Sequence, residues 1–194
     1  MPNLPRMFVP GVSLHARHRG NNRCAVFGDD EDREAYLLML QSAIGRYRVA
    51  AHGFTLMTTH THLVLTPTST DGASLAMKQL GGQYVGYFNR KYGRVGTLWT
   101  GRFRAKPIPD ERYWLTCLKY IEQNPVRAKI VVLPEQYRWS SYRAHALGEP
   151  IEWLSSHPAL EALGATNAER QAAYRAYCAT PATVAEIVRQ RFKD

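Results

Sequence analysis

The chain has 194 residues, of which 45% are hydrophobic, and its 25 basic and 16 acidic side chains give a formal net charge of +9. This hydrophobic fraction excludes a globally disordered chain, and no apolar run approaches the roughly 20 residues of a membrane span. The basic excess favours an anionic partner, most often nucleic acid, although a merely basic protein would carry the same charge.

The first part of the chain predicts three strands and one helix. Residues 12–17 alternate between apolar and polar side chains, as a half-buried strand does. The acidic residues 29–32 then open a helix, because carboxylates stabilise the positive end of a helix. A strand over residues 49–58 and a strand that carries His60 and His62 follow, and together they form a predicted hairpin.

The middle of the chain predicts two helices around a further strand. Residues 72–92 form the first helix, and residues 103–108 form the strand. A second helix runs from Glu111 towards Asn124 with apolar residues at helical spacing, and Pro125 ends or kinks it.

The resulting order β-α-β-β-α-β-α predicts an α+β fold, a ferredoxin-like antiparallel sheet with helices packed on one face. Residues 1–147 would form this domain, and residues 148–194 would form a C-terminal helical extension. Within the extension, residues 167–178 and 183–192 are helix candidates that Pro181 separates.

The segment His60-Thr61-His62 predicts half of a metal site. Residues two apart on a strand project from the same face, so both imidazoles can reach one ion while Thr61 points the other way. Two imidazoles and several waters would leave an open, reactive coordination sphere. Most pairs of this kind are surface or core histidines, so the spacing alone is weak support.

The chain has no GxSxG elbow that would supply a serine nucleophile. A candidate nucleophile, Tyr120, lies on the predicted helix before Pro125. Tyr120 and Asn124 are four residues apart and share a face if the helix persists that far. Asn124 could then supply an oxygen to the ion while Tyr120 supplies a phenolate. Helical geometry supports Tyr113 nearly as well, and the pattern does not choose between the two tyrosines.

Residues 72–109 contain no acidic residue and interleave cations with aromatic side chains. Cations pair with phosphates, and flat rings stack on unpaired bases, so this pattern is typical of a nucleic-acid surface. The alternative is a solvated basic face over aromatic core residues, which we favour for Tyr87 and Phe88. For Trp99 and Arg102, in a glycine-rich loop, we favour contact with a ligand.

The sequence resembles the HUH-type tyrosine transposases of the IS200 class, and most of all the REP-associated tyrosine transposases. The resemblance covers roughly residues 5–147 and rests on five motifs. These are Arg19-Gly20-Asn21-Asn22-Arg23, Asp30-Glu31-Asp32-Arg33, Met57-Thr58-Thr59-His60-Thr61-His62-Leu63, Gly96-Thr97-Leu98-Trp99-Thr100-Gly101-Arg102-Phe103 and Tyr120-Ile121-Glu122-Gln123-Asn124-Pro125-Val126-Arg127-Ala128. Residues 139–145 match the segment that follows the tyrosine helix.

The resemblance implies cleavage of single-stranded DNA by Tyr120, through a 5′-phosphotyrosine and a free 3′-OH. It implies that His60, His62 and Asn124 hold Mg²⁺ or Mn²⁺. Relatives recognise DNA hairpins with short single-stranded flanks and work as dimers, so the expected partners are hairpin DNA and a second copy of the chain. The candidate DNA-binding residues are Arg17, Arg19, Arg23, Arg90, Lys91, Arg94, Trp99, Arg102 and Arg104.

One departure from the family pattern concerns Thr61, where the family has a bulky hydrophobic residue, often Val. Threonine is β-branched and keeps the strand, but its hydroxyl needs a partner if it is buried. Two rival interpretations are a domesticated protein that binds DNA hairpins and seldom cuts them, and an RNA-binding protein. A third is a structural basic protein with an incidental histidine pair.

The expected location is the cytoplasm, in association with the nucleoid. No signal peptide is visible at the N-terminus. Cys24, Cys117 and Cys178 are too far apart in sequence for a disulfide framework or a CxxC zinc site, so a reducing compartment fits.

Overall fold

A four-stranded antiparallel sheet forms the centre of the computed structural model, which describes residues 6–181 and Phe192. The strands are β1 (Leu14–Arg19), β2 (Val49–Met57), β3 (His60–Pro67) and β4 (Arg104–Pro107). Their order across the sheet is β2-β3-β1-β4, and each neighbouring pair is antiparallel. The predicted hairpin of β2 and β3 is confirmed, and the first strand lies two residues later than predicted.

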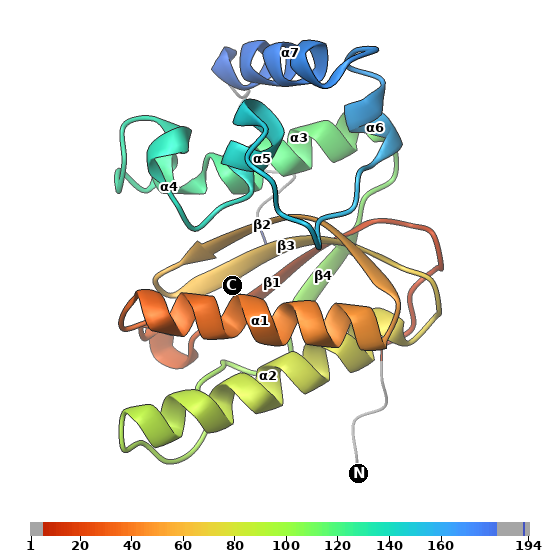
Figure 1. Ribbon diagram of the computed structural model, residues 1–194. Helices are drawn as coiled ribbons and strands as arrows, with labels where there is room; N and C mark the ends of the chain where they lie inside the picture. The colour runs from red at the N-terminus through yellow and green to blue at the C-terminus, as the bar shows by residue number, and fades with distance from the viewer. Residues whose placement is uncertain (1–5, 182–191, 193–194) are drawn as a thin grey trace.

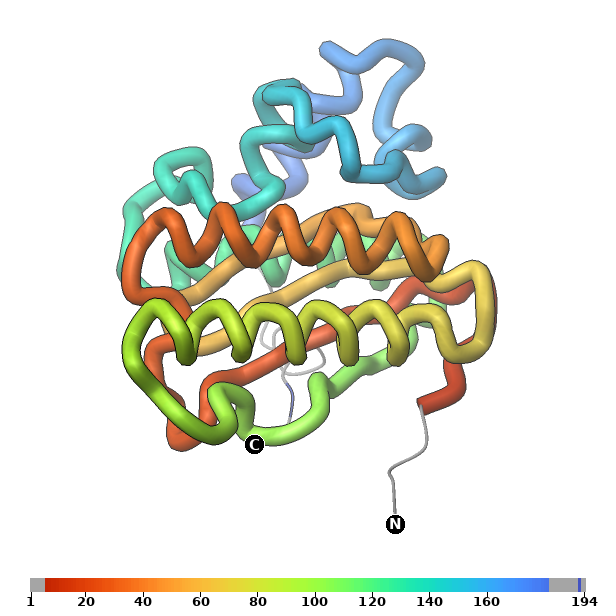
Figure 2. The backbone as a smooth tube through the Cα atoms, turned by 60° about the horizontal axis from the view of Figure 1, so that its bottom comes forward, coloured from red at the N-terminus to blue at the C-terminus, as the bar shows by residue number. Residues whose placement is uncertain are grey.

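Two long helices cover one face of the sheet (Figures 1 and 2). They are α1 (Asp30–Arg46), which follows β1, and α2 (Gly72–Lys91), which follows β3. Asp29 caps α1 by accepting a hydrogen bond from the Asp32 backbone N–H at 3.0 Å. Between this face and the two helices lies a core that includes Leu40, Leu63 and Tyr84. The β-α-β-β-α-β order and the strand order confirm the ferredoxin-like fold.

The other face of the sheet is also covered, which differs from the prediction of helices on one face (Figure 1). Helices α3 (Glu111–Glu122) and α4 (Asn124–Arg127) contact this face. Helices α5 (Tyr142–Leu147), α6 (Pro158–Glu161) and α7 (Asn167–Ala179) pack against α3 or against one another, farther from the sheet. Short 3₁₀ turns lie at Asn21–Arg23 and Pro134–Gln136. Val64 on β3, Leu118 on α3 and Tyr174 on α7 belong to one buried cluster here. Both faces of the sheet therefore carry buried apolar residues that a helical layer covers.

The C-terminal extension is tied to α3 by polar contacts as well as by apolar packing. The ammonium group of Lys119 donates to the backbone carbonyls of Tyr177 and Thr180 at 2.8 and 2.6 Å. The amide of Gln123 donates to the carbonyl of Cys178 at 2.6 Å. Helix α7 confirms the first predicted helix of the extension, whereas the second, over 183–192, lies outside the described residues apart from Phe192, which is not helical.

The domain boundary predicted at residue 147 stays a prediction. Residues on both sides of it contribute to the same buried cluster. In the described part of the chain, no helix has the length and apolarity that crossing a membrane requires.

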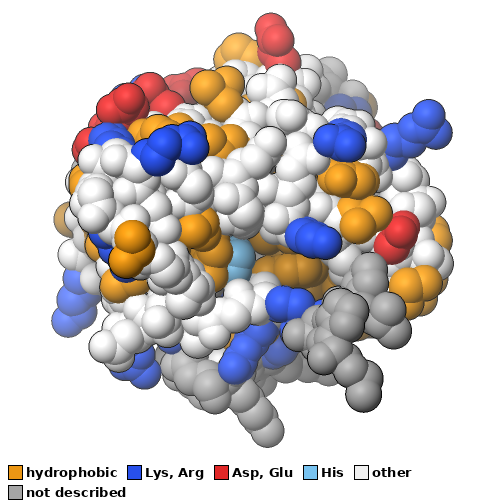
Figure 3. All heavy atoms as spheres, turned by 90° about the horizontal axis from the view of Figure 1, so that it is seen from below, with side chains coloured by type: hydrophobic (Ala, Val, Ile, Leu, Met, Phe, Trp, Pro, Cys, Tyr) orange, Lys and Arg blue, Asp and Glu red, His pale blue; other side chains and the backbone are white. Residues whose placement is uncertain are grey.

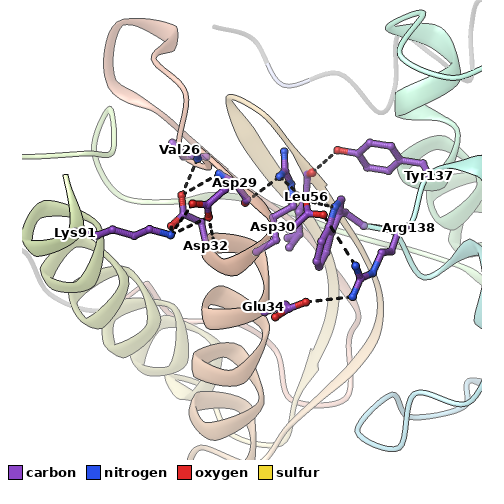
Figure 4. A network of polar contacts seen from close by, with 12 residues as sticks. Val26, Asp29, Asp30, Asp32, Glu34, Leu56, Lys91, Tyr137 and Arg138 are labelled. Carbon is purple, nitrogen blue, oxygen red and sulfur yellow. Dashed lines mark hydrogen bonds and ion pairs between the residues drawn. The ribbon is translucent and has the colours of Figure 1, made fainter.

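A cluster of acidic side chains at the start of α1 binds the end of α2 (Figure 4). The Lys91 ammonium lies 2.8 Å from Asp29, 2.9 Å from Glu31 and 3.0 Å from Asp32. Asp32 is fully buried and also accepts a hydrogen bond from the Tyr92 hydroxyl at 2.8 Å. The acidic run therefore does more than begin a helix, because it fastens the two helices of this layer together.

Candidate active site and nucleic-acid interface

The pairing of β1 with β3 brings arginines beside the histidine pair. Arg17 lies opposite His62 and Arg19 lies opposite His60, so all four side chains are on the face of the sheet that α3 covers. A cavity of about 280 Å³ opens there, and we call it the HxH cavity. It is lined by Arg17, Arg19, His60, His62, Tyr120, Asn124 and Phe192. The predicted nucleophile and all three predicted metal ligands thus meet in one cavity of one chain.

His62 is buried and is positioned by a second histidine, His15 of β1. The Nε2 atom of His15 lies 2.7 Å from Nδ1 of His62, so the imidazole of His62 has a fixed orientation. Burial, followed by the nearby charges of His15, His60, Arg17 and Arg127, holds the pKa of His62 well below its usual value. The ring is therefore neutral, which is the form that binds a metal.

Thr61 points to the opposite face, as the alternation of the strand predicts. It is fully buried, and its hydroxyl lies 3.2 Å from the hydroxyl of Tyr36 on α1. The partner that a buried threonine requires is therefore present. The neighbouring Thr59 Oγ1 lies 3.1 Å from Nδ1 of His60, and this contact helps to orient the first histidine of the pair.

Tyr120 faces the histidines across the HxH cavity. Its ring centroid lies 6.0 Å from those of both His15 and His62. The guanidinium of Arg127 stacks over the Tyr120 ring at 4.3 Å and also donates to the Tyr120 backbone carbonyl. Both Tyr113 and Tyr120 pack at the margin of the buried cluster under α3, but only Tyr120 also lines the HxH cavity.

Asn124 lines the HxH cavity although α3 ends at Glu122. Backbone hydrogen bonds bridge the break, since the Gln123 N–H donates to Lys119 O at 3.0 Å and the Ala128 N–H donates to Asn124 O at 2.8 Å. The chain therefore continues in a nearly helical path, and Asn124 stays on the side of Tyr120 as the spacing predicts.

The donor set fits a divalent cation in an open site. With Nδ1 of His62 engaged by His15, Nε2 is the nitrogen through which His62 can bind an ion. The Asn124 amide nitrogen is buried without a hydrogen-bond partner, so no hydrogen bond at that atom opposes turning the amide oxygen towards a cation. Within the described ranges, no group of three or more His, Cys, Asp or Glu side chains could hold a metal. An ion here would therefore rely on two imidazoles and the Asn124 amide.

A second and larger cavity, of about 440 Å³, adjoins the first and is strongly basic. We call it the arginine cavity, and its cationic lining residues are Arg6, Arg17, Arg19, Arg23, Arg102 and Arg104. Five of these six are predicted DNA-binding residues, and Arg17 and Arg19 line both cavities. Arg6 was missed, because it lies in an irregular N-terminal arm with no pattern that indicates its position.

The structure does not bring the other predicted DNA-binding residues into these two cavities. Lys91 binds the carboxylates at the start of α1, and Arg94 stacks on the ring of Phe88 at 5.5 Å. Arg90 lines a different surface hollow, between α1 and α2. Trp99 is buried and stacks on His18 at 3.9 Å, so this face of its indole is not available to a base.

His15 was also missed, although it positions a predicted ligand. Alternation along β1 places His15 and Arg17 on one face. That signal says nothing about which strand pairs with β1, and only the pairing with β3 brings His15 to His62.

Comparisons with known proteins relate the chain to transposases. The model of the family described as "Transposase IS200 like" matches residues 9–124. A solved structure of a REP-associated tyrosine transposase bound to a REP hairpin is 20% identical, with a TM-score of 0.58, and the match covers 80% of this chain and 93% of that chain. A solved structure of a putative transposase from Deinococcus radiodurans R1 is 17% identical, with a TM-score of 0.43. That match covers 70% of this chain and 95% of that chain. The comparison with curated proteins found no match.

The fold is the one that the REP-associated tyrosine transposase has, and the family model covers more than half of the chain. The chain belongs to the IS200-like transposase family.

Proposed function

We propose that this protein is a metal-dependent endonuclease and strand transferase that acts on single-stranded DNA at hairpins. The observation that carries the proposal is the HxH cavity, in which Tyr120, His60, His62 and Asn124 meet within one chain. The adjoining arginine cavity offers several fixed positive charges for the phosphates of the strand. The hairpin as substrate is supported by the structural relative that was solved with a REP hairpin.

In the proposed reaction, the phenolic oxygen of Tyr120 attacks the phosphorus of a DNA phosphodiester. The bond from phosphorus to the 3′ oxygen breaks, which leaves a 5′-phosphotyrosine and a free 3′-OH. A 3′-OH that attacks this linkage reverses the chemistry and joins two strands, with the phenol as leaving group. The phosphotyrosine conserves the energy of the broken bond, so the cycle needs no nucleotide triphosphate.

The chain's own residues have distinct tasks in this scheme. Arg17 and Arg19 bind phosphates of the strand near the scissile bond, because they line both the HxH cavity and the arginine cavity. His15 holds His62, and Arg127 holds the ring of Tyr120 from the far side. His60, His62 and Asn124 would hold Mg²⁺ or Mn²⁺, which when bound polarises the phosphate and offsets charge in the transition state.

Incubation with labelled hairpin DNA and Mn²⁺, followed by a denaturing gel, tests the proposal. We expect a covalent protein–DNA adduct from the native chain that is absent in Tyr120→Phe and much reduced in His62→Ala. Tyr113→Phe is the matched control, since it removes a phenol from the same helix outside the cavity, and it should form the adduct normally. Adduct from Tyr120→Phe but not from Tyr113→Phe would show that the assigned nucleophile is wrong.

One observation favours the second candidate, a protein that binds hairpins and seldom cuts them. The ring of Phe192 lies within the HxH cavity, 4.8 Å from the ring of His15 and 5.9 Å from the Arg17 guanidinium. A DNA strand would have to displace this ring. If the native chain binds hairpins without cutting and Phe192→Ala also fails to cut, the binding function is the better description.

Two further arms use the same preparations. An RNA hairpin of the same sequence should bind more weakly than DNA if the substrate is DNA. Light scattering of the native chain tests the proposed homodimer, and mixing Tyr120→Phe with His62→Ala reports the arrangement of the site. Because one chain supplies the complete HxH cavity, we expect the mixture to form no more adduct than the two variants apart.

A further inference from the structure

A third cavity, of about 460 Å³, lies between α2 and the loop that precedes β4. We call it the Gly81 cavity, and six of its lining residues matter here: His18, Met77, Gly81, Trp99, Arg102 and Phe103. Figure 3, which views the molecule from the α2 side, shows a hollow with a histidine side chain at its base and hydrophobic and basic side chains around it. Its volume lies within the usual range for small-ligand sites.

Two buried polar atoms at this cavity have no hydrogen-bond partner. His18 and Trp99 are 6% and 5% exposed, and neither Nδ1 of His18 nor Nε1 of Trp99 has a partner. Nε2 of His18 lies 3.0 Å from the carbonyl of Gly101, which can only accept, so Nε2 carries the hydrogen. Nδ1 of His18 is then an acceptor, while the indole N–H of Trp99 is a donor. Unsatisfied buried groups of this kind are costly, and a ligand would satisfy them.

Gly81 leaves space directly beside both atoms. A Cβ built on Gly81 would lie 3.8 Å from Nε1 of Trp99, 4.0 Å from Nδ1 of His18 and 3.4 Å from Cε1 of His18. The unpaired donor, Trp99 Nε1, and the unpaired acceptor, His18 Nδ1, therefore border the same small volume. A side chain at position 81 would fill that volume. Glycine within a helix costs about 1 kcal/mol relative to alanine, so this space is maintained at the expense of helix stability.

The Gly81 cavity, of which this volume is one edge, suits one nucleotide of a strand. Met77 and Phe103 provide apolar walls, and Arg102 provides positive charge. Arg102 and His18 also line the arginine cavity, which in turn shares Arg17 with the HxH cavity. The three cavities are thus neighbours along one basic path, with the Gly81 cavity at the end away from Tyr120.

We propose that the Gly81 cavity binds a single unpaired nucleobase of the DNA strand and reads its identity through His18 and Trp99. Each nucleobase is flat, with apolar faces, and presents hydrogen-bond donors or acceptors on its edge, which matches the apolar walls and the donor–acceptor pair. This inference rests on the proposed function, because the occupant is taken to belong to the strand that the other two cavities hold. Base binding in the Gly81 cavity would make the protein selective for the DNA sequence at one position of the strand.

A pool of DNA hairpins with randomised single-stranded flanks tests the proposal. The pool is bound to the native chain, to Gly81→Ala and to Gly86→Ala, and the bound DNA is sequenced. Gly86 lies on the same helix, and a Cβ there would meet only the Arg90 side chain, at 4.0 Å. Both variants replace a helical glycine by alanine, so both should fold at least as stably as the native chain.

We expect the native chain and Gly86→Ala to prefer one base at a particular flank position by about tenfold or more. Gly81→Ala should lose the preference at that position and keep it elsewhere, and His18→Phe, which keeps a ring on Trp99, should do the same. An abasic substitution at that position should weaken binding by the native chain but add nothing to the effect of Gly81→Ala.

Identical base preferences in Gly81→Ala and the native chain would overturn the inference, and so would uniform weakening at all positions. In either case hairpin binding itself survives, and the proposed function is unaffected. If the native chain binds no hairpin more tightly than a blunt duplex of equal length, the proposed function fails and the base-binding cavity fails with it.

Discussion

Tyr174 of α7 donates its phenolic hydrogen to Glu122 of α3 over 2.6 Å, and neither side chain is exposed to solvent. The same carboxylate accepts a hydrogen bond from Ser141 Oγ at 2.5 Å and lies 2.8 Å from Nδ1 of His145. Glu122 is two residues after Tyr120, so this buried network connects the helix of the proposed nucleophile to the C-terminal extension. Stability and activity should therefore both depend on α7.

Tyr174→Phe tests this connection with little change of shape. Removing one hydrogen bond to a buried carboxylate should lower the free energy of unfolding by about 1.5–3 kcal/mol, the range for hydrogen bonds to charged groups. Urea denaturation measures the effect. Tyr47→Phe, a half-buried tyrosine at the end of α1, should change stability by less than about 0.5 kcal/mol. Equal free energies of unfolding for the two variants would show that the hydrogen bond from Tyr174 to Glu122 does not stabilise the fold.

Shortening the chain to residues 1–147 tests the predicted domain boundary. The shortened chain lacks Tyr174 and the carbonyls that bind Lys119 and Gln123, so charged groups of α3 lose their partners. We expect a loss of at least about 3 kcal/mol, the cost of leaving a buried charge without its partner. Urea denaturation of both chains makes the comparison. If the shortened chain is as stable as the full chain, residues 148–194 are a dispensable appendage.

Thr61 and Tyr36 form a pair whose energetics depend on both hydroxyls. Thr61→Val leaves the fully buried Tyr36 hydroxyl without this partner, which should cost about 1–3 kcal/mol. The double variant Thr61→Val, Tyr36→Phe removes both polar groups and should recover most of that loss. Unfolding free energies of the native chain, both single variants and the double variant complete the cycle. Strictly additive losses would mean that the two hydroxyls do not interact.

The arrangement of the fold was predictable as far as local patterns extend. Alternation predicts the strands, and acidic caps such as Asp29 and Asp110 predict where helices begin. Which face α3 covers was not predictable, because it depends on contacts distant in sequence. A Cβ at Gly53 of β2 would lie 2.4 Å from Cδ1 of Leu118, so this glycine admits α3 to the second face. A single glycine within a strand does not reveal which helix approaches it.

In the candidate site, too, local patterns predicted some features, whereas others depend on contacts between residues distant in sequence. His60, His62, Tyr120 and Asn124 were predicted from short spacings and motifs, and they meet in the HxH cavity. Lys91 was predicted to bind DNA because it lies in a stretch without acids, and the ion pairs it makes were not predicted. Its partners lie at the start of α1, and only the packing of α1 on α2 brings them together.

His18 predicts a pH dependence of stability. Burial lowers the pKa of His18 to about 4, although its hydrogen bond to the Gly101 carbonyl opposes the shift. In the unfolded chain, the imidazole of His18 therefore binds a proton near pH 6.5. In the folded chain, it binds a proton only near pH 4. As the pH falls through this window, the native chain should lose up to about 3 kcal/mol through this residue.

The His18→Phe variant isolates that contribution, because other histidines titrate in both chains. The difference in unfolding free energy between the native chain and the variant should favour the native chain less at pH 4 than at pH 7. Denaturation across this range measures it. Parallel pH profiles would mean that folding does not perturb His18.

His15 predicts a metal dependence that differs from simple loss of activity. Because His15 holds Nδ1 of His62 at 2.7 Å, His15→Ala should leave the imidazole of His62 free to turn. Loss of such an orienting partner typically weakens metal affinity by about 10- to 100-fold. In the proposed cleavage reaction, the Mn²⁺ concentration for half-maximal rate should rise by that factor, while the rate at saturating Mn²⁺ falls less. His157→Ala, which removes a ring stacked on Trp114, is the control and should leave the Mn²⁺ dependence unchanged. A lower rate in His15→Ala with an unaltered Mn²⁺ midpoint would mean that His15 contributes to cleavage by a route other than orienting a ligand.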